Sequence, residues 1–344
     1  MEKWCRGKVI GVEKEIYSLK KKRILLFAPQ FFDYEKYIKE EIERQGGIVH
    51  LYDERNNPTA VEKILLRKMR FLLERRINQY YQEVSESEKE FNPDYIVFIN
   101  PESVNGESLK ILRKTFPESC FILYMWDSSK NKKIKQYIDK FDYSFSFDKS
   151  DCEMFGMSFL PLFYIPAFEE MRQNDYDYDV SFIGTVHSDR PEIIYKLKEY
   201  CDNNNLSYFF YLYIPGKLML LLRLITNKYL RKLNNGYIHL EALDKSTLSK
   251  ITARTRCVLD INHPKQTGLT MRTLEMIGQK RKIMTTNEHV KEYDFYVPSN
   301  QIILHRNEIN ILPEYIRDEY RDIAEEIYNK YSLENWIKTL FGKK

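Results

Sequence analysis

Residues 24–52 decide the fold, and they read ILLFAPQFFDYEKYIKEEIERQGGIVHLY. The apolar run at 24–29 is typical of a strand that is buried on both faces of a parallel sheet. A helical pattern follows over 34–45, two glycines end it, and residues 48–52 predict a second strand. Strand, helix and strand in this order indicate the start of a Rossmann-like domain.

The alternation of strands and helices continues along the chain and then restarts. Apolar runs at 95–99 and 121–125 predict two more strands, and the polar, acidic stretch 168–179 reads as a linker. After this linker, strands are predicted over 180–183, 206–213, 257–261 and 282–286, and helices over 190–201, 245–255 and 269–279.

This pattern predicts an α/β protein of the GT-B architecture, in which two Rossmann-like domains face a central cleft. We expect residues 1–168 to form the first domain and residues 179–313 the second. Residues 314–344 read as a helical tail that packs back towards the first domain. The length of 344 residues and a hydrophobic content of 43% suit two domains with buried cores.

Composition excludes several classes of protein. Lys and Arg total 54 and Asp and Glu total 50, and the resulting net charge of +4 is too small to indicate a nucleic acid partner. The five cysteines are far apart and form no C-x-x-C pair, which argues against a disulfide framework or a zinc site. The N-terminus carries charges where a signal peptide needs an apolar core, and no window of 18 apolar residues occurs. We therefore expect a cytoplasmic protein.

The densest group of polar residues lies at 259–278, LDINHPKQTGLTMRTLEMIG. A buried strand ends there, a loop with a glycine crosses the carboxyl edge of the sheet, and a helix begins, which is where free N–H groups attract phosphate. Arg272 and Glu275 share one face of the helix, so that Arg272 suits a diphosphate and Glu275 the hydroxyls of a ribose. The alternative is an ordinary capped helix with an ion pair on its surface.

The stretch HPKQTGLTMRTLEMIGQKRKIMTTN at 263–287, with YDFYVPSNQIIL at 293–304, resembles a known family. It is similar to the donor-binding half of bacterial GT-B glycosyltransferases of the CgeB-like and lipopolysaccharide or capsule biosynthesis kind, most strongly over 180–305. The resemblance implies that the second domain binds a nucleotide diphosphate-sugar and the first binds the acceptor.

The resemblance also assigns roles to residues of this loop and helix. It implies that Arg272 binds the diphosphate, that Glu275 binds the ribose, and that Gly268, Leu269 and Thr270 form the phosphate-facing helix start. We place His263 and Thr267 in the same donor site. Many retaining GT-B enzymes carry an E-x7-E motif, but here Thr267 stands where its first acid would be, so inversion and retention both stay open.

A second loop, SFIGTVHSDR at 181–190, again joins a strand to a helix through a glycine. In the family resembled, this loop closes over the donor phosphates, which implies donor contacts for Gly184, Thr185, His187 and Arg190. The alternative is a solvated helix start that Ser188 or Asp189 caps.

In the first half, Asp127 follows the apolar strand 121–125 and is expected to face the cleft. A glycosyl transfer with inversion needs a general base for the acceptor hydroxyl, and Asp127 is our candidate. The alternative is that Asp127 caps a helix after Ser129. Residues 30–32, after the first strand, are candidates for an acceptor platform.

The stretch between Asp202 and Glu241 contains no acidic residue. On a single helix over 217–232, apolar residues lie mainly on one side and five basic residues on the other, the pattern of an interfacial helix. We therefore expect reversible contact of 217–232 with the inner membrane surface; the alternative is a buried helix with a solvated basic edge. The basic residues are Lys217, Arg223, Lys228, Arg231 and Lys232, and the apolar ones are Leu218, Met219, Leu222, Ile225, Tyr229, Leu230 and Leu233.

The histidines show no metal-binding spacing, and the D-x-D spacing at 175–179 falls in the expected linker. Together with the family resemblance, this predicts a glycosyltransferase that needs no metal or cofactor. It would move a sugar from a nucleotide diphosphate-sugar to a glycan or lipid-linked acceptor in cell-surface polysaccharide synthesis. The alternatives are a nucleotide-sugar 2-epimerase and a non-catalytic protein that binds nucleotide-sugars or glycans.

Overall fold

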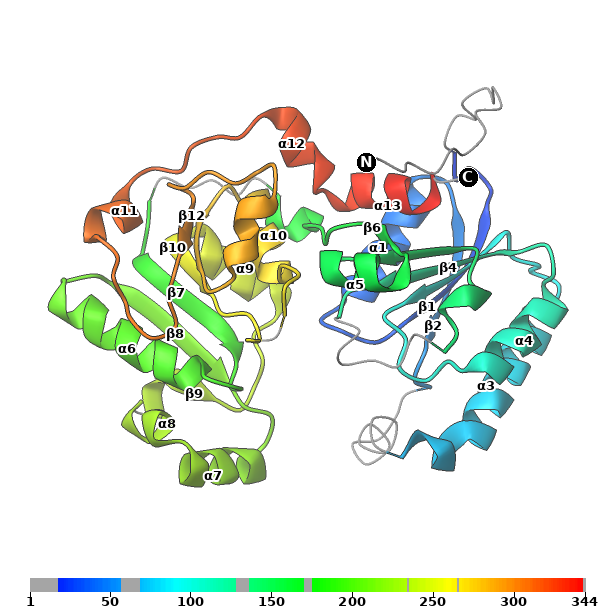
Figure 1. The fold of residues 1–344 in the computed structure, drawn as a ribbon, viewed down its shortest axis with the longest axis horizontal. Coiled ribbons are helices and arrows are strands. Elements are labelled where there is room, and N and C mark those ends of the chain that lie inside the picture. The colour runs from blue at the N-terminus through cyan, green and yellow to red at the C-terminus, as the bar shows by residue number, and fades with distance from the viewer. Residues whose placement is uncertain are drawn as a thin grey trace, which may run out of the picture.

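The computed structural model describes residues 18–56, 69–127, 136–169, 175–233, 235–264 and 266–342. These residues form two sheets of six parallel strands with flanking helices, one sheet in each half of the chain (Figure 1). The predicted α/β fold with two Rossmann-like domains is therefore confirmed. Of the linker expected at 168–179, the structure describes residues 168–169 and 175–179. Residues 170–174 lie outside the described part.

The first sheet has the strand order β2-β1-β3-β4-β5-β6. Strands β1, β3 and β4 are buried along almost their whole length, as their continuous apolar runs predict. The strands are β1 (Arg23–Ala28), β2 (Ile48–Asp53), β3 (Tyr95–Ile99), β4 (Cys120–Met125), β5 (Tyr143–Ser146) and β6 (Ser158–Phe159), and the helices α1 (Tyr34–Arg44), α3 (Glu74–Ser87), α4 (Gly106–Thr115) and α5 (Lys149–Phe155).

The second sheet has the order β12-β11-β10-β7-β8-β9. Its core consists of apolar residues from β7, β8 and β10 that pack against α6. The strands are β7 (Tyr178–Thr185), β8 (Tyr208–Tyr213), β9 (Ile238–His239), β10 (Thr255–Asp260), β11 (Lys282–Thr285) and β12 (Gln301–Ile303), and the helices α6 (Arg190–Asn203), α7 (Lys217–Thr226), α8 (Lys228–Lys232), α9 (Lys245–Ala253) and α10 (Met271–Gly278).

The strand order of each sheet reverses at one place, between β1 and β3 in the first sheet and between β7 and β10 in the second. Ligands of open parallel sheets bind outside the carboxyl ends of the strands at such a point. The loops that leave these strand ends are therefore where a site is expected.

The C-terminal segment runs from the second half to the first (Figure 1). It contains α11 (Pro313–Arg317), α12 (Glu325–Lys330) and α13 (Leu333–Phe341). The ring of Trp336 in α13 lies 4.7 Å from that of Tyr124 in β4, and Arg44 of α1 forms a 2.7 Å ion pair with Glu334. Helix α13 is thus part of the core of the first half.

The prediction of a single helix over 217–232 is wrong, because two helices, α7 and α8, occupy this segment. Asn227 separates them: its backbone is extended, and its side chain accepts hydrogen bonds from the N–H groups of Tyr229 and Leu230, so it caps α8. Leu230 and Leu233 are buried in the core of the second half and do not belong to an exposed apolar face. No described helix is long and apolar enough to cross a membrane.

Candidate active site between the two halves

A cavity of about 510 Å³ lies between the two halves. The loops after β1, β3 and β4 line it on one side, and the end of β8, the loops after β7, β9 and β10 and the first turns of α10 line it on the other. These are the carboxyl ends of both sheets, so the cavity stands where strand order predicts a ligand. Of the residues proposed from the sequence, Asp127, Gly184, Thr185, His187, Arg190, Leu269, Thr270, Arg272 and Glu275 line it.

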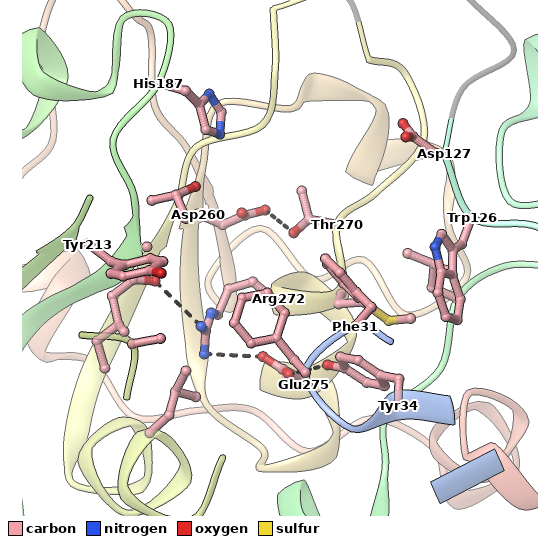
Figure 2. Close-up of a pocket in the computed structure, with 18 of the residues that line it drawn as sticks. Phe31, Tyr34, Trp126, Asp127, His187, Tyr213, Asp260, Thr270, Arg272 and Glu275 are labelled. Carbon is pink, nitrogen blue, oxygen red and sulfur yellow. Dashed lines mark hydrogen bonds and ion pairs between the residues drawn. The ribbon is translucent and has the colours of Figure 1, made fainter. Parts of the chain in front are cut away.

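Glu275 is the centre of a charged cluster in the cavity wall (Figure 2). Its side chain is only 3% exposed; its Oε1 accepts hydrogen bonds from the Tyr34 hydroxyl and, at 2.8 Å, from Nζ of Lys245, and its Oε2 lies 3.1 Å from Nη1 of Arg272. Burial by itself raises the pKa of Glu275, but the positive charges of Lys245 and Arg272 outweigh it and hold the pKa below its ordinary value. Arg272 and Glu275 do share a helix face, but their ion pair is buried and not on the surface.

Lys245 and Tyr34 are parts of this cluster that sequence reasoning missed. Nζ of Lys245 also donates to the Tyr34 hydroxyl at 2.8 Å and lies 3.9 Å from the centre of its ring. Burial lowers the pKa of Lys245 and, together with Glu275, raises that of Tyr34. Tyr34 and Glu275 are far apart in sequence, and only the folded chain brings them together.

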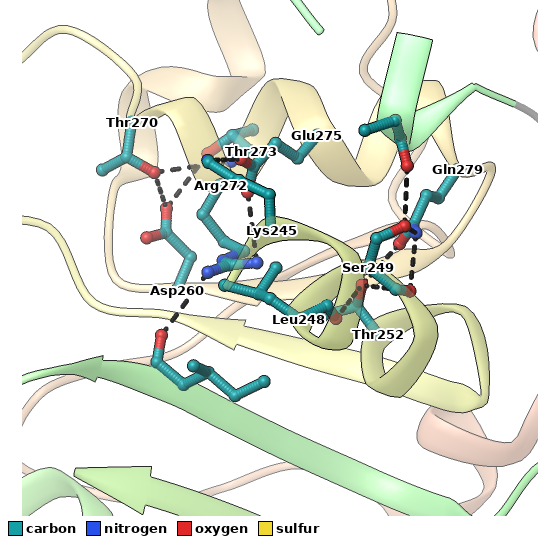
Figure 3. A network of polar contacts seen from close by, with 12 residues as sticks. Lys245, Leu248, Ser249, Thr252, Asp260, Thr270, Arg272, Thr273, Glu275 and Gln279 are labelled. Atoms are coloured by element: carbon teal, nitrogen blue, oxygen red, sulfur yellow. Dashed lines mark hydrogen bonds and ion pairs between the residues drawn. The ribbon is translucent and has the colours of Figure 1, made fainter. Parts of the chain in front are cut away.

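Helices α9 and α10 carry Lys245 and Glu275, and a polar network fixes the two helices to each other (Figure 3). Gln279, the C-cap residue of α10, donates to the carbonyl of Ser249 at 2.9 Å and accepts from the hydroxyl of Thr252 at 2.7 Å. All three residues are buried. The network therefore sets the distance between the ammonium and carboxylate groups of the site.

Asp260, at the end of β10, anchors the start of α10. Its Oδ2 accepts from the hydroxyls of Thr270 at 2.8 Å and Thr273 at 3.0 Å, and the Thr270 hydroxyl oxygen also accepts from the N–H of Thr273 as the cap of the helix. Burial raises the pKa of Asp260. Asp260 also lines the cavity. A carboxylate as the last residue of a buried strand is a feature of the sequence from which this position could have been predicted.

Arg190 and His187 place a guanidinium group and an imidazole group after β7. Nε of Arg190 donates to the carbonyl of Ile261 at 3.0 Å and its Nη1 to the carbonyl of Thr185 at 3.1 Å, so these acceptors are neutral oxygens. Burial lowers the pKa of Arg190 to about 10, and burial and Arg190 lower that of His187 to about 4. At neutral pH the loop offers a guanidinium ion and a neutral imidazole. A Cβ atom at Gly184 would lie 2.8 Å from the ring of Phe182, which explains the glycine.

The remaining proposed donor residues lie beside the cavity and not in its wall. The Thr267 hydroxyl donates to Asp148 at 2.6 Å, and the N–H of Gly268 donates to the same carboxylate at 3.3 Å. A Cβ atom at Gly268 would lie 2.5 Å from the ring of Phe147. These two residues therefore join the loop to the first half of the chain, whereas the ring of His263 lies 6.4 Å from that of His187.

Aromatic residues form the wall of the first half, and Figure 2 shows Trp126 and Asp127 opposite His187, Asp260 and Arg272. The rings of Phe31 and Trp126 are 5.9 Å apart, and Phe31 and Phe32 are 43% and 48% exposed. Phe32 has a left-handed backbone with φ of 50°, a strained conformation that is common at functional sites. The helix that Asp127 might alternatively cap lies outside the described residues.

No group of three or more His, Cys, Asp or Glu side chains in the described residues is arranged to hold a metal ion. In the D-x-D segment, Asp177 forms a bidentate pair with Arg254, with an Nη2 to Oδ1 distance of 2.6 Å. This aspartate has a structural partner.

The sequence matches no protein-family model and no curated protein. Its structure is nevertheless similar to several solved structures. The apo form of the lipopolysaccharide outer core galactosyltransferase WaaB has a TM-score of 0.51 and 12% identity over 94% of this chain and 100% of that chain. The structure described as "Trehalose-6-phosphate from E. coli bound with UDP-2-fluoro glucose" has a TM-score of 0.61 and 10% identity over 94% of this chain and 100% of that chain.

A putative UDP-N-acetylglucosamine 2-epimerase from Listeria monocytogenes has a TM-score of 0.50 and 12% identity over 92% of this chain and 94% of that chain. At such identities these likenesses show the fold alone. Two six-stranded parallel sheets, whose carboxyl ends meet at one cavity, define the chain as a protein of the GT-B fold.

Proposed function

We propose that this protein is a glycosyltransferase that moves a sugar from a nucleotide diphosphate-sugar to a glycan or lipid-linked acceptor. The observation that carries the proposal is the combination of a guanidinium group and a buried carboxylate in one cavity wall, at the start of a helix. Cationic side chains and free helix N–H groups suit a diphosphate, and a carboxylate suits the hydroxyls of a ribose. Lipopolysaccharide or capsule synthesis is the proposed setting, and the likeness to the structure of WaaB supports it.

The donor would bind the second half of the chain. Arg190, whose described hydrogen bonds go to neutral oxygens of Thr185 and Ile261, and Arg272 would meet the negative charge of the diphosphate. Glu275 would accept a hydrogen bond from the ribose. One of the similar structures contains bound UDP-2-fluoro glucose, which supports a nucleotide donor here.

The acceptor would bind the aromatic wall of the first half. Phe31 and Phe32 are exposed and Trp126 beside them is partly buried, and the three rings together offer a surface on which a sugar can stack. In the transfer, the acceptor oxygen forms a bond to the anomeric carbon and its proton passes to Asp127. The bond from the anomeric carbon to the diphosphate breaks, and its electron pair goes to the diphosphate oxygen, whose charge Arg190 and Arg272 stabilise without a metal ion.

Product analysis with a panel of nucleotide diphosphate-sugars tests this function. We expect transfer to a glycan or lipid-linked acceptor with release of the nucleoside diphosphate, and a loss of at least about a hundredfold in kcat in Asp127→Asn, whose amide cannot take a proton. Asp175→Asn, on a residue outside the cavity, is the control. Transfer that is equally fast in Asp127→Asn would exclude this aspartate as the base.

A nucleotide-sugar 2-epimerase is the second candidate, because a putative epimerase shares the fold. The exposed aromatic wall favours the transferase, since an epimerase needs no second substrate. Incubation with the donor alone separates the two functions: epimerised donor would support the epimerase. Binding of the donor without any turnover across an acceptor panel would support a non-catalytic binding protein.

A further inference from the structure

Helix α7 carries an apolar stripe that faces away from the protein. Leu218, Leu221, Leu222 and Ile225 follow the spacing that normally faces a core, yet they are 73%, 56%, 51% and 67% exposed. No residue of α7 is buried. Other leucines of the helix, Leu220 and Leu224, pack on the core of the second half. The helix is therefore anchored on one side and offers four large aliphatic side chains on the other.

Basic residues are concentrated in α7 and in α8, the helix that follows it. Lys217, Arg223, Lys228, Arg231 and Lys232 are all in α7 or α8, and no acidic residue occurs between Asp202 and Glu241. Nη1 of Arg231 donates to the carbonyls of Leu224 and Ile225 at 2.7 and 2.9 Å, which holds this cation at the C-terminal end of α7. The surface thus combines an aliphatic stripe with a net charge of +5.

The first half brings a second apolar group to the same edge of the molecule. Met69, Phe71 and Leu72, just before α3, are 43%, 66% and 55% exposed. Figure 1 shows the start of α3 and the whole of α7 at the lower edge, one in each half. The segments that carry these exposed residues therefore lie along the same edge of the molecule in this view.

We infer that this edge docks on a lipid bilayer that contains anionic headgroups. Aliphatic side chains on an amphipathic helix enter the boundary between headgroups and acyl chains, and the flanking bases meet the negative surface. A second copy of the chain is a poorer partner, because symmetric packing of α7 on α7 would set five positive charges against five others.

The position of α7 suggests how docking would serve the cavity, by bringing a membrane-bound acceptor close to it. This step rests on the proposed function. Helix α7 begins four residues after Tyr213, which lines the cavity. Docking by α7 would hold the cavity close to the bilayer surface. A lipid-linked acceptor would then be presented from the membrane.

Co-sedimentation of the full chain with vesicles tests the docking. We expect binding to vesicles of phosphatidylethanolamine and phosphatidylglycerol that weakens as salt is added, and little binding to phosphatidylcholine vesicles. Replacement of Leu218, Leu221, Leu222 and Ile225 by Gln, a good helix former, should weaken partitioning at least about thirtyfold. Lys217→Gln with Lys228→Gln should weaken it about twenty-five-fold, since each base contributes a factor of about five.

The matched control is Met154→Gln with Leu312→Gln, two exposed apolar residues outside this edge, and it should change partitioning less than about twofold. Circular dichroism and a thermal shift with nucleoside diphosphates show that each variant is folded. Wild-type protein that stays unbound while a nucleotide still shifts its melting temperature would overturn the docking alone. Vesicle binding without any nucleotide response would instead overturn the proposed function.

Two other results would also overturn the inference. One is equal binding of the four-residue Gln variant and the wild type to anionic vesicles. The other is a wild-type dimer in light scattering that the four-residue Gln variant turns into a monomer, without vesicle binding by either. That result would assign α7 to a contact between copies of the chain.

Discussion

At the scale of single residues, Glu275 holds a charged cluster together, and we propose that it also binds the ribose of the donor. Its carboxylate accepts hydrogen bonds from Tyr34 and Lys245 on Oε1 and forms an ion pair with Arg272 through Oε2. A carboxylate can accept about four hydrogen bonds in all. One position thus remains on Oε2, the oxygen near Arg272. A ribose hydroxyl would take that position or replace the Tyr34 hydroxyl.

Replacement of Glu275 by Gln should lower the free energy of unfolding by about 3 kcal/mol, because it leaves the buried ammonium of Lys245 without its carboxylate. Urea denaturation measures this change. Glu334→Gln is the control: Glu334 is an exposed partner of Arg44 and Lys338, and its loss should cost less than about 1 kcal/mol. Equal effects of the two substitutions would show that the Glu275 cluster does not stabilise the fold.

His187 makes stability depend on pH. The pKa of His187 in the folded chain is about 4, below its ordinary value of 6.5. Between pH 6.5 and pH 4 the unfolded chain therefore binds more protons than the folded chain. The free energy of unfolding falls as the pH falls through this range. Between pH 7 and pH 4, His187→Gln should lose about 1–2 kcal/mol less stability than the wild type, after allowance for solvent screening. The measurement is urea denaturation at each pH, with the exposed His305→Gln as control. Parallel curves for wild type and His187→Gln would contradict the account.

Sequence reasoning at this scale worked for local relations. The pair Arg272 and Glu275 is three residues apart on one helix, so its contact follows from helix geometry. The contact of Tyr34 with Glu275 depends on how two sheets are placed, and no spacing in the sequence encodes it. The donor contacts of these residues stay predictions.

At the scale of elements, the loop between β10 and α10 must pass very close to the first half. Gly268→Ala would place a Cβ atom 2.5 Å from the buried ring of Phe147, so we expect a loss of about 1–3 kcal/mol in the free energy of unfolding. The control is Gly106→Ala at the first position of α4, where the nearest atom to a Cβ is 3.6 Å away. The control should change stability by less than about 0.5 kcal/mol.

A double substitution identifies the clash as the cause. Phe147→Leu gives the new methyl group space, so Gly268→Ala should cost less in the Phe147→Leu background than in the wild type. If Gly268→Ala is as mild as Gly106→Ala, the close approach of the loop does not constrain the fold.

The long buried strands were predictable because their apolar runs are continuous, as in β1 and β4. Short strands were not: β6 and β9 have two residues each, too few to show a period. The split between α7 and α8 was missed because the apolar pattern continues across Asn227, while the capping bonds of that side chain end one helix and start the next. Local hydrogen bonding there outweighed periodicity.

At the scale of the whole molecule, Tyr34 of the first half bonds to Glu275 of the second across the cavity wall. Tyr34→Phe should raise the affinity for a nucleoside diphosphate, by about tenfold at most, because a ribose hydroxyl no longer competes with the tyrosine hydroxyl. Calorimetric titration measures it, and Tyr37→Phe on the same helix is the control. Weaker binding by Tyr34→Phe would mean that the tyrosine itself holds the ligand.

The proposed function requires that the cavity between the halves binds a nucleoside diphosphate. Calorimetric titration of the wild type with a panel of nucleoside diphosphates tests it most directly, beside Arg272→Ala and a control, Arg254→Ala, on a residue outside the cavity. We predict binding of at least one nucleotide, at least about tenfold weaker binding by Arg272→Ala because a charged contact with phosphate is lost, and unchanged binding by Arg254→Ala. Absence of binding for every nucleotide, or equal affinity of the wild type and Arg272→Ala, would contradict the account.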